Sequence, residues 1–517
     1  MPPPSRHQSD QMLSLIEACN FRARSNVKKN VAVIGGGITG LSAAYFLQEK
    51  AKERGIEIHC TLIEADRRWG GKIVTDRVSD FIIEGGPDSF LSQKPWGLAL
   101  CRKLGLIDQI VQSNPVHKTI YILSGGRLKK FPEGMNLMIP GRMTPFLLTS
   151  LISWRGKARM GLDLLIPKNN KKEDESIAAF VRRRLGNEAV TTFAEPILAT
   201  IYAGDVEKLS MQATFPQLTR LEREFRSLIF GVWMRQRGMA NASAWPSASR
   251  TSTAGDRGPT IPMTLFVTLR NGLEDLVSAL ERQMDGTVCR LGQRVNGLYP
   301  QERGYAIHLP NETIHADAVI VTTGATDAAR FIRPWNKTLA GRLDGIPYVS
   351  TATVSLGFRR TDVAHPLDGF GFVTTRAEKK SVLATTWSST KFEGRADPGH
   401  VLIRSFLGGT HQEEIVDLPD DILIAKACDD LTPLLGIRAK PILTRIFRWN
   451  KANPQYNIGH LDRVTAIEQE TEKHAGLFLA GAAYRGVGIP DCIEQAWTTS
   501  EKVIQFISMA SANHQSD

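Results

Sequence analysis

A glycine-rich turn between a buried strand and a helix is the feature that most constrains how this chain folds. The segment NVAVI at 30–34 is short and apolar, as in a strand covered on both faces, and GGGITG at 35–40 follows it directly. Gly35, Gly37 and Gly40 occupy the glycine places of a GxGxxG turn. Such a turn lets the backbone approach a pyrophosphate at a helix N-terminus and packs that helix against its strand.

The next strand, 57–64 (EIHCTLIE), ends on an acidic residue at a suitable place. Glu64 lies about 20 residues beyond the last glycine, where a carboxylate can accept hydrogen bonds from both ribose hydroxyls of a dinucleotide. A glycine turn followed by an unrelated surface glutamate is the alternative, and the strand–turn–helix–strand order argues against it. The pattern predicts an α/β fold with a doubly wound sheet. Further cofactor contacts are then expected from Gly36, Ile38, Thr39 and Ala65.

A second glycine pair separates flavin from nicotinamide cofactors. Gly70 and Gly71 follow Glu64 in the stretch ADRRWGGK. The pair resembles the glycine doublet of the flavoprotein superfamily that contains amine oxidases, carotenoid desaturases and protoporphyrinogen oxidases. There the doublet passes close to the diphosphate and flavin ring of FAD, so the resemblance implies noncovalent FAD with Lys72 beside it. A plain two-glycine turn with Lys72 in solvent is the alternative.

Four longer strings narrow the resemblance. They are IIEGGPDSF at 82–90, EPILATIYAGDVEKLSM at 195–211, NPQYNIGH at 453–460 and LAGAAYRGVGIPDCI at 479–493. Together they resemble the FAD-dependent porphyrinogen oxidases of haem biosynthesis, which comprise coproporphyrinogen III and protoporphyrinogen oxidases. The soluble Gram-positive coproporphyrinogen III oxidases are the nearest type. The resemblance runs from about residue 30 to about residue 507 and omits both tails and the 237–260 loop.

The strings also carry physical expectations. A Gly-Gly-Pro turn is tight and stiff, so backbone can approach a flat ring there, and a helix N-terminus after a glycine-rich loop favours the electron-rich N1/O2 edge of reduced flavin. The resemblance implies that Val295 meets the adenine through its backbone and that Trp449 lies near the isoalloxazine. An ordinary turn, a helix cap and a core tryptophan remain the alternatives. The further cofactor contacts expected are Gly86, Pro87, Asp88, Ser89, Gly481, Val487, Gly488 and Ile489.

Nucleotide signals near both ends and in the middle predict a cofactor domain assembled from separated segments. Between them the pattern is helix-rich in one stretch, and at 348–410 it alternates as in an antiparallel sheet. We expect the FAD-binding domain at 30–90, 271–330 and 465–510, a helical domain at 91–205, a substrate-binding domain with a mixed or antiparallel sheet at 206–270 and 331–464, and flexible segments at 1–28 and 237–260.

Composition narrows the partners. The formal charge is +11 and the pI about 9.3. The sequence has no long Lys/Arg run of the kind that binds nucleic acid, so the expected binding partner of the basic residues is an anionic substrate or an anionic membrane surface. Six cysteines without a CxxC pattern give no reason to expect a metal. No apolar core marks 1–28 as a secretory signal, and no run reaches the roughly 18 apolar residues of a spanning helix. We expect a cytoplasmic protein with at most peripheral membrane contact, the most apolar candidate being 143–154.

The basic residues expected to anchor substrate carboxylates are Lys72, Lys94, Lys118 and Arg376, although each alone also fits a solvated surface charge. Mammalian and plant members of the family carry an arginine upstream of the strand that matches YILSG. This chain has Thr119 or Ile120 at that place, so that anchor is not transferred.

Porphyrinogen oxidation needs no metal and no protein nucleophile. A meso hydride passes to flavin N5 while a pyrrole N–H loses its proton, and molecular oxygen reoxidises the flavin, giving H2O2. Three such two-electron cycles yield the aromatic porphyrin. The protein then positions and shields, so no catalytic acid or base is assigned.

Coproporphyrinogen III is the expected substrate, with protoporphyrinogen IX as the alternative; contact with other haem-pathway enzymes is possible. An amine oxidase, a carotenoid desaturase and a non-catalytic flavin- or porphyrin-binding partner are the rival functions.

Overall fold

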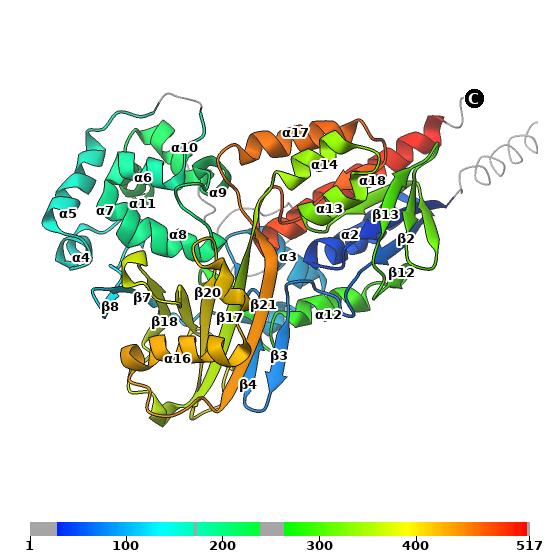
Figure 1. Ribbon diagram of the computed structural model, residues 1–517. Coiled ribbons are helices and arrows are strands. Elements are labelled where there is room, and N and C mark those ends of the chain that lie inside the picture. The colour runs from blue at the N-terminus through cyan, green and yellow to red at the C-terminus, as the bar shows by residue number, and fades with distance from the viewer. Residues whose placement is uncertain (1–27, 170–172, 238–262, 514–517) are drawn as a thin grey trace, which may run out of the picture.

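The structure is a computed structural model that describes residues 28–169, 173–237 and 263–513 (Figure 1). Apart from Lys28 and Arg237, the segments expected to be flexible, 1–28 and 237–260, lie outside the described residues. Figure 1 shows three parts side by side: a parallel sheet with its helices, a larger mixed sheet, and a group of helices at the far end from the parallel sheet.

The parallel sheet has five strands, with the first strand of the chain at its centre. All of its neighbouring strands pair in parallel, and the order makes it doubly wound. The predicted fold class is therefore confirmed. The strands, in spatial order, are β12 (Thr287–Arg290), β2 (Ile58–Ile63), β1 (Lys29–Ile34), β16 (Ala318–Val321) and β22 (Leu477–Leu479).

Both faces of this sheet are covered, because alternate residues of β1 enter two different cores. Val31 and Val33 pack with α2 (Ile38–Arg54), α12 (Glu274–Arg282) and α18 (Ile489–Asn513). Ala32 and Ile34 pack on the opposite side. That side is built from β13 (Gly297–Pro300), β14 (Tyr305–His308), β15 (Thr313–Ala316), α13 (Ala325–Ile332), α14 (Lys337–Asp344) and α17 (His460–Glu472).

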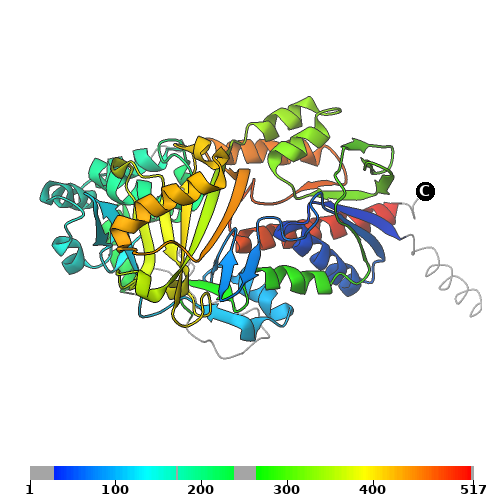
Figure 2. The ribbon, with the colours of Figure 1, turned by 60° about the horizontal axis from the view of Figure 1, so that its bottom comes forward.

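The larger sheet has seven strands, and all its neighbours are antiparallel except β18 and β7. Helix α16 (Asp420–Leu435) lies across one face, where Leu423, Ala427 and Leu431 join its core (Figure 2). The strands, in spatial order, are β21 (Leu443–Pro454), β17 (Tyr348–Arg359), β20 (His400–Gly408), β19 (Ala384–Trp387), β18 (Gly369–Thr374), β7 (Thr119–Ser124) and β8 (Arg127–Lys130).

The structure differs from the expected domain limits in two places. Strands β7 and β8 lie within 91–205, the segment expected to be helical, because β7 completes the large sheet by pairing with β18. Residues 211–236, expected in the substrate domain, pack with the helices instead, since Met211 and Leu218 share one core with Ile177. The remaining domain limits stay predictions.

The helical part is built around that core. No helix in the described ranges is both long and apolar enough to cross a membrane. The main helices of the helical part are α4 (Met143–Leu148), α5 (Trp154–Gly161), α6 (Ile177–Leu185), α8 (Glu195–Tyr202), α9 (Met211–Thr214), α10 (Pro216–Phe225) and α11 (Leu228–Gln236). Further short elements of the chain are β3 (Thr75–Val78), β4 (Phe81–Glu84), β5 (Phe90–Leu91), α3 (Pro95–Lys103), β6 (Ile110–Gln112), β9 (Met135–Asn136), β10 (Ile139–Pro140) and β11 (Phe266–Leu269).

A fully buried ion pair holds the helical part together. Arg184 Nε donates to Asp163 Oδ1 at 2.6 Å, and its other nitrogens donate to backbone carbonyls of Asp163, Ile166, Pro167 and Arg226. Asp163 Oδ2 accepts from Ser227 Oγ at 2.6 Å. The pair therefore joins α6 to the segment after α5 and to the residues just before α11.

We expect Arg184→Met to lower the free energy of unfolding of this part by about 3–5 kcal/mol, because it leaves the Asp163 carboxylate buried without its partner. The measurement is denaturant unfolding followed by hydrogen exchange of the helical part. The control is Arg182→Met, which removes an exposed pair with Glu207 and is expected to cost less than about 1 kcal/mol. Equal losses in the two variants would contradict a special role for the buried pair.

Candidate functional site

The turn at 35–40, called here the nucleotide turn, is built so that backbone replaces side chains. Gly35 has φ +109°, in the left-handed region that favours glycine. A Cβ on Gly40 would lie 1.8 Å from the Gly35 carbonyl oxygen, so α2 reaches the strand only with glycine there. A Cβ on Gly37 would find its nearest atom, Gly71 Cα, 4.0 Å away. The space in front of Gly37 is open, next to the first N–H groups of α2, which come from Ile38 and Thr39.

The glycine pair at 70–71 lies directly against this turn. Gly70 pairs with Gly37 in an isolated parallel bridge, and Gly70 N–H donates to Gly36 O at 2.8 Å. A Cβ on Gly71 would come within 3.1 Å of Gly37 Cα. Two segments that the sequence analysis assigned separately to one diphosphate are therefore neighbours, and neither places a side chain between them.

Glu64 directly follows β2 and lies beside the nucleotide turn. Its carboxylate accepts hydrogen bonds from the N–H of Gly36 at 2.5 Å and of Asp66 at 2.8 Å, and its oxygens keep lone pairs for further donors. It lines a pocket of about 210 Å³ at the carboxyl edge of the parallel sheet. Ala65, Gln293, Val295, Thr323 and Arg330 also line this pocket.

Val295 is a residue of this pocket whose backbone groups are free to bind a ligand. The residue is buried, and no hydrogen-bond partner among the described residues meets its N–H or its C=O. Buried backbone groups are nearly always paired, so a free donor and acceptor in a pocket wall fit a planar base that offers both. The pocket therefore suits an adenosine group, with Glu64 at the ribose.

The turn at 85–89 lies between the backbone of Lys72 and strand β21 of the seven-stranded sheet. A Cβ on Gly85 would meet the ring of Phe447 at 2.6 Å, and one on Gly86 would meet the Lys72 carbonyl oxygen at 1.8 Å. Trp449 Nε1 donates to Gly85 O at 3.0 Å, and Arg404 donates to the carbonyls of both glycines. Trp449 thus lies at the glycine turn and beside the Lys72 backbone, half-buried.

Buried charges also support the same turn through Asp88. Lys391 Nζ donates to both oxygens of Asp88, at 3.1 and 2.9 Å, and Ser89 Oγ donates to Asp88 Oδ1 at 2.6 Å. Burial favours the neutral acid, but Lys391 and Arg404 outweigh it and hold the pKa of Asp88 well below its usual range. Asp88 and Ser89 are therefore engaged with protein groups and fix the turn's conformation.

The glycine-rich loop between β22 and α18 forms the third side of the site. Gly481 and Gly486 have φ of +132° and +129°, and a Cβ on Gly481 would lie 3.7 Å from Thr39 Oγ1, at the start of α2. Gly488 N–H donates to Asp491 Oδ2 at 3.2 Å. The N–H groups of Val487 and Ile489 have no acceptor among the described residues. They stand at the positive end of a long helix.

Two of the four basic residues expected to meet substrate lie near this loop. Lys94 Nζ pairs with Asp491, 2.5 Å from Oδ1, and Lys72 Nζ donates to Ala452 O. Lys72 reaches solvent, yet the protein packed around it lowers its pKa. Burial raises the pKa of the Cys492 thiol, at the start of α18, and both ammonium groups lie close enough to oppose that rise.

Lys118 and Arg376, the other two, lie away from this loop and far from each other. Lys118 is exposed just before β7, whereas Arg376 follows β18 and sits 3.6 Å from Glu195. Because β7 and β18 run in parallel, the two basic residues stand at opposite ends of the strand pair, roughly 20 Å apart. The structure therefore groups Lys72 with Lys94 and leaves Lys118 and Arg376 outside that group.

Several residues that contact these segments had no role in the sequence analysis. Lys391 and Arg404 lie under the 85–89 turn, and Asp491 and Tyr456 hold the loop before α18. Tyr456 and Asp491 stand within quoted strings, so the strings were the available signal. No local pattern marks Lys391 or Arg404, whose burial depends on tertiary contacts.

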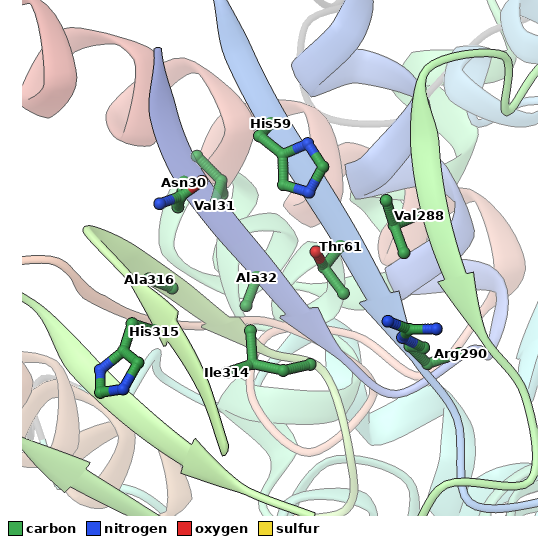
Figure 3. A pocket seen from close by; sticks show the side chains of 10 residues that line it. All are labelled: Asn30, Val31, Ala32, His59, Thr61, Val288, Arg290, Ile314, His315 and Ala316. Atoms are coloured by element: carbon green, nitrogen blue, oxygen red, sulfur yellow. The ribbon is translucent and has the colours of Figure 1, made fainter. Parts of the chain in front are cut away.

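A second pocket, of about 260 Å³, lies on the face of the parallel sheet between β15 and strands β1, β2 and β12 (Figure 3). Figure 3 shows His59 and Thr61 on β2, Arg290 at the end of β12 and His315 on β15. It contains none of the residues of the nucleotide turn. Over the described ranges, no group of three or more His, Cys, Asp or Glu side chains is placed to hold a metal.

Comparison with protein families gives a match over most of the chain. Residues 38–504 match the family described as flavin containing amine oxidoreductase. The coproporphyrinogen III oxidase of Bacillus subtilis (strain 168) is 36% identical, over 93% of this chain and 99% of that protein. That of Propionibacterium freudenreichii subsp. freudenreichii is 37% identical, over 92% and 90%. The chloroplastic protoporphyrinogen oxidase 1 of Arabidopsis thaliana is 29% identical, over 94% and 89%.

Solved structures agree with these matches. A structure provisionally assigned as a protoporphyrinogen oxidase from Exiguobacterium sp. 255-15 has a TM-score of 0.79 and 30% identity, and the match covers 92% of this chain and 98% of that one. A reduced UDP-galactopyranose mutase, at 14% identity and a TM-score of 0.67 over 92% and 96%, shares the fold alone.

These matches confirm the resemblance inferred from the motifs. The chain is an oxidoreductase whose cofactor is FAD. It belongs to the flavin-containing amine oxidoreductase family, in the branch of the coproporphyrinogen III and protoporphyrinogen oxidases.

Proposed function

We propose that this protein oxidises coproporphyrinogen III to coproporphyrin III in haem biosynthesis, with FAD as the oxidant and molecular oxygen as the final acceptor. The observation that carries the proposal is the assembly of one FAD-shaped cradle from three distant segments, in a chain that matches coproporphyrinogen III oxidases along almost their whole length. The cytoplasm as location, contact with other haem-pathway enzymes and at most peripheral membrane contact belong to the same proposal.

The proposed placement of FAD follows the free backbone groups. The nucleotide turn and the glycine pair hold the diphosphate, Glu64 holds the ribose, and the unpaired backbone of Val295 meets the adenine. Gly86, Trp449 and the loop before α18 border the isoalloxazine. The contacts with the diphosphate and the adenine use glycines or unpaired backbone groups, whereas those with the ribose and the isoalloxazine also use the side chains of Glu64 and Trp449.

Bound FAD supplies the redox chemistry by accepting a hydride from a meso carbon, while a pyrrole proton leaves to water. The chain's own groups bind and orient. The N–H groups of Val487 and Ile489 stabilise negative charge at the N1/O2 edge, and the 85–89 turn keeps its shape through Asp88 and Lys391. No side chain is assigned as acid or base.

Substrate charge supports the choice of porphyrinogen. Coproporphyrinogen III carries four propionates, and protoporphyrinogen IX carries two propionates and two vinyl groups. Lys72 is the strongest anchor because the residue is exposed and its ammonium meets a backbone carbonyl rather than a carboxylate, whereas Asp491 already holds Lys94 and Glu195 faces Arg376. Lys118 remains an exposed candidate. Protoporphyrinogen IX oxidation is the second candidate function, favoured by the similarity to the plant protoporphyrinogen oxidases.

Gly37→Val tests the cofactor site. The substituted side chain fits the protein, since the nearest atom to a Cβ is 4.0 Å away, but it fills the space assigned to the diphosphate. We expect a folded protein that has lost most of its FAD, as measured by flavin absorbance per chain and by thermal unfolding. Gly341→Val, at an exposed helix position with no atom within 4 Å of its Cβ, is the control and keeps its FAD. Normal FAD content in the Gly37 variant would refute the placement.

Substrate preference tests the anchors. Two additional carboxylates paired at a solvated rim are worth about 1 kcal/mol each, so kcat/KM is expected to favour coproporphyrinogen III by roughly tenfold to a few hundredfold at low salt. The vinyl groups oppose this by burying apolar surface. The preference falls as ionic strength rises, because salt screens exposed charges.

The variant pair for this measurement is Lys72→Met and Lys440→Met. The first is expected to reduce the preference by about fivefold, whereas Lys440 is exposed before β21 and its loss leaves the preference unchanged. A clear preference for protoporphyrinogen IX at low salt would assign the second candidate function instead.

Peroxide yield tests the acceptor. Three two-electron reoxidations by oxygen release about three H2O2 for each porphyrin formed. The measurement combines porphyrin fluorescence with peroxide detection in a catalase-free assay. Porphyrin formed under air without peroxide would point to a different acceptor.

A further inference from the structure

The string NPQYNIGH at 453–460 has no role in the function proposed so far. It runs from the end of β21 to the first residue of α17 and passes behind the glycine-rich loop that precedes α18. Two of its side chains are almost completely buried: Tyr456 is 1% exposed and His460 is 0% exposed. Both make their hydrogen bonds to the backbone of that loop.

The Tyr456 hydroxyl spans the loop. It accepts a hydrogen bond from Gly486 N–H at 2.9 Å and donates one to the carbonyl oxygen of Ala482 at 2.8 Å. Gly486 has φ +129°, so this bond holds a backbone conformation that few other residues adopt. Because the hydroxyl has a single proton, both of its bonds are defined: one as acceptor and one as donor.

His460 holds the tyrosine ring and the middle of the loop. The two rings stack with centroids 3.9 Å apart and planes 14° apart, and His460 Nε2 lies 2.8 Å from Tyr484 O. Burial lowers the pKa of His460 to about 4, so the ring is neutral near pH 7 and carries its proton on the nitrogen facing Tyr484 O. Three alternate residues of the loop are thus held from one side.

The other side of the loop leaves free donors. Gln495 donates to Gly486 O at 3.4 Å, and Asp491 accepts from Gly488 N–H. On either side of Gly488, the N–H groups of Val487 and Ile489 have no acceptor in the part of the chain that the structure describes. Their direction is therefore set by Gly486 and Gly488, and Gly486 in turn depends on Tyr456.

We infer that Tyr456 is a positioning residue, which, with His460 behind it, aims the free N–H groups at the start of α18 toward the flavin edge that becomes negative on reduction. This rests on the FAD placement proposed above. The residue touches neither substrate nor the reacting atoms. Its effect reaches the flavin through Gly486, and it favours reduced over oxidised FAD because an oriented N–H stabilises an anion more than a neutral edge.

Tyr456→Phe tests the inference in the FAD-loaded enzyme, because it removes the hydroxyl and keeps the ring. We expect near-normal FAD content, with binding of reduced relative to oxidised FAD weakened about tenfold, which corresponds to a fall of about 30 mV in the two-electron midpoint potential. Deuterium uptake of the peptide spanning 481–488 rises in the same variant. The potential is read by equilibration with reference dyes and uptake by mass spectrometry.

Tyr305→Phe is the matched control. Tyr305 is 2% exposed, and its hydroxyl donates to a single carbonyl, that of Ala475 at 3.2 Å, without contacting the loop. It is expected to lose similar stability while leaving the potential and the loop's exchange unchanged. An unchanged potential in a folded Tyr456→Phe protein, or an equal shift in both variants, overturns the inference.

Two further measurements keep the outcomes separate. If Tyr456→Phe fails to fold, His460→Gln is measured instead; it removes the stacked ring and is expected to lower the potential in the same direction, so an unchanged potential overturns the inference. Failure of the FAD placement shows differently, as full FAD content in Gly37→Val. A potential shift in Tyr456→Phe together with FAD loss in Gly37→Val supports both proposals.

Discussion

Backbone-to-backbone contact between the nucleotide turn and the glycine pair is the constraint on which the rest of the structure depends. Gly37 and Gly70 form a bridge, and a Cβ on Gly71 would come within 3.1 Å of Gly37 Cα. This contact sets the chain's path from β2 to Lys72 and Gly86, and through them to the edge of the seven-stranded sheet. The relative position of the two sheets thus depends on glycines, because these segments meet through backbone and leave no room for side chains.

The parts of the fold that sequence could predict are those whose signals are local. The apolar strand at 30–34, the glycine spacing after it and Glu64 at the end of the next strand lie within one short stretch, and the structure joins them as a doubly wound sheet. The glycine-rich loop within 479–493 and the helix that begins after it could be predicted for the same reason. The individual site residues remain predictions, since the comparisons establish the family and its cofactor but do not test single contacts.

The parts that sequence missed depend on distant partners. Strand β7 joins the large sheet because Thr119–Leu123 pair with Gly369–Thr374. No local sequence pattern near residue 119 predicts that pairing. Helices α9–α11 join the helical core through Leu218 and Leu228, whose spacing would suit any neighbouring surface. Arg404 and Lys391 lie in the segment 348–410, where apolar and polar residues alternate, yet both are buried against Asp88. Burial of a charge is a tertiary property, so no local pattern reveals it.

The order of strands in the parallel sheet has a consequence for how the protein is made. The cradle begins at Gly35 and closes only with β22 and α18, which are synthesised after every other strand and helix that the structure describes. Until then β16 lacks its neighbour and the helix bearing Ile493, Ala496 and Val503 cannot cover α2. The helical part and the seven-stranded sheet contain all their strands and helices earlier, so they can be complete while the nucleotide side still exposes apolar surface. The complete cradle therefore forms only after residues 477–513 have been synthesised, and the apolar surface exposed before then favours aggregation.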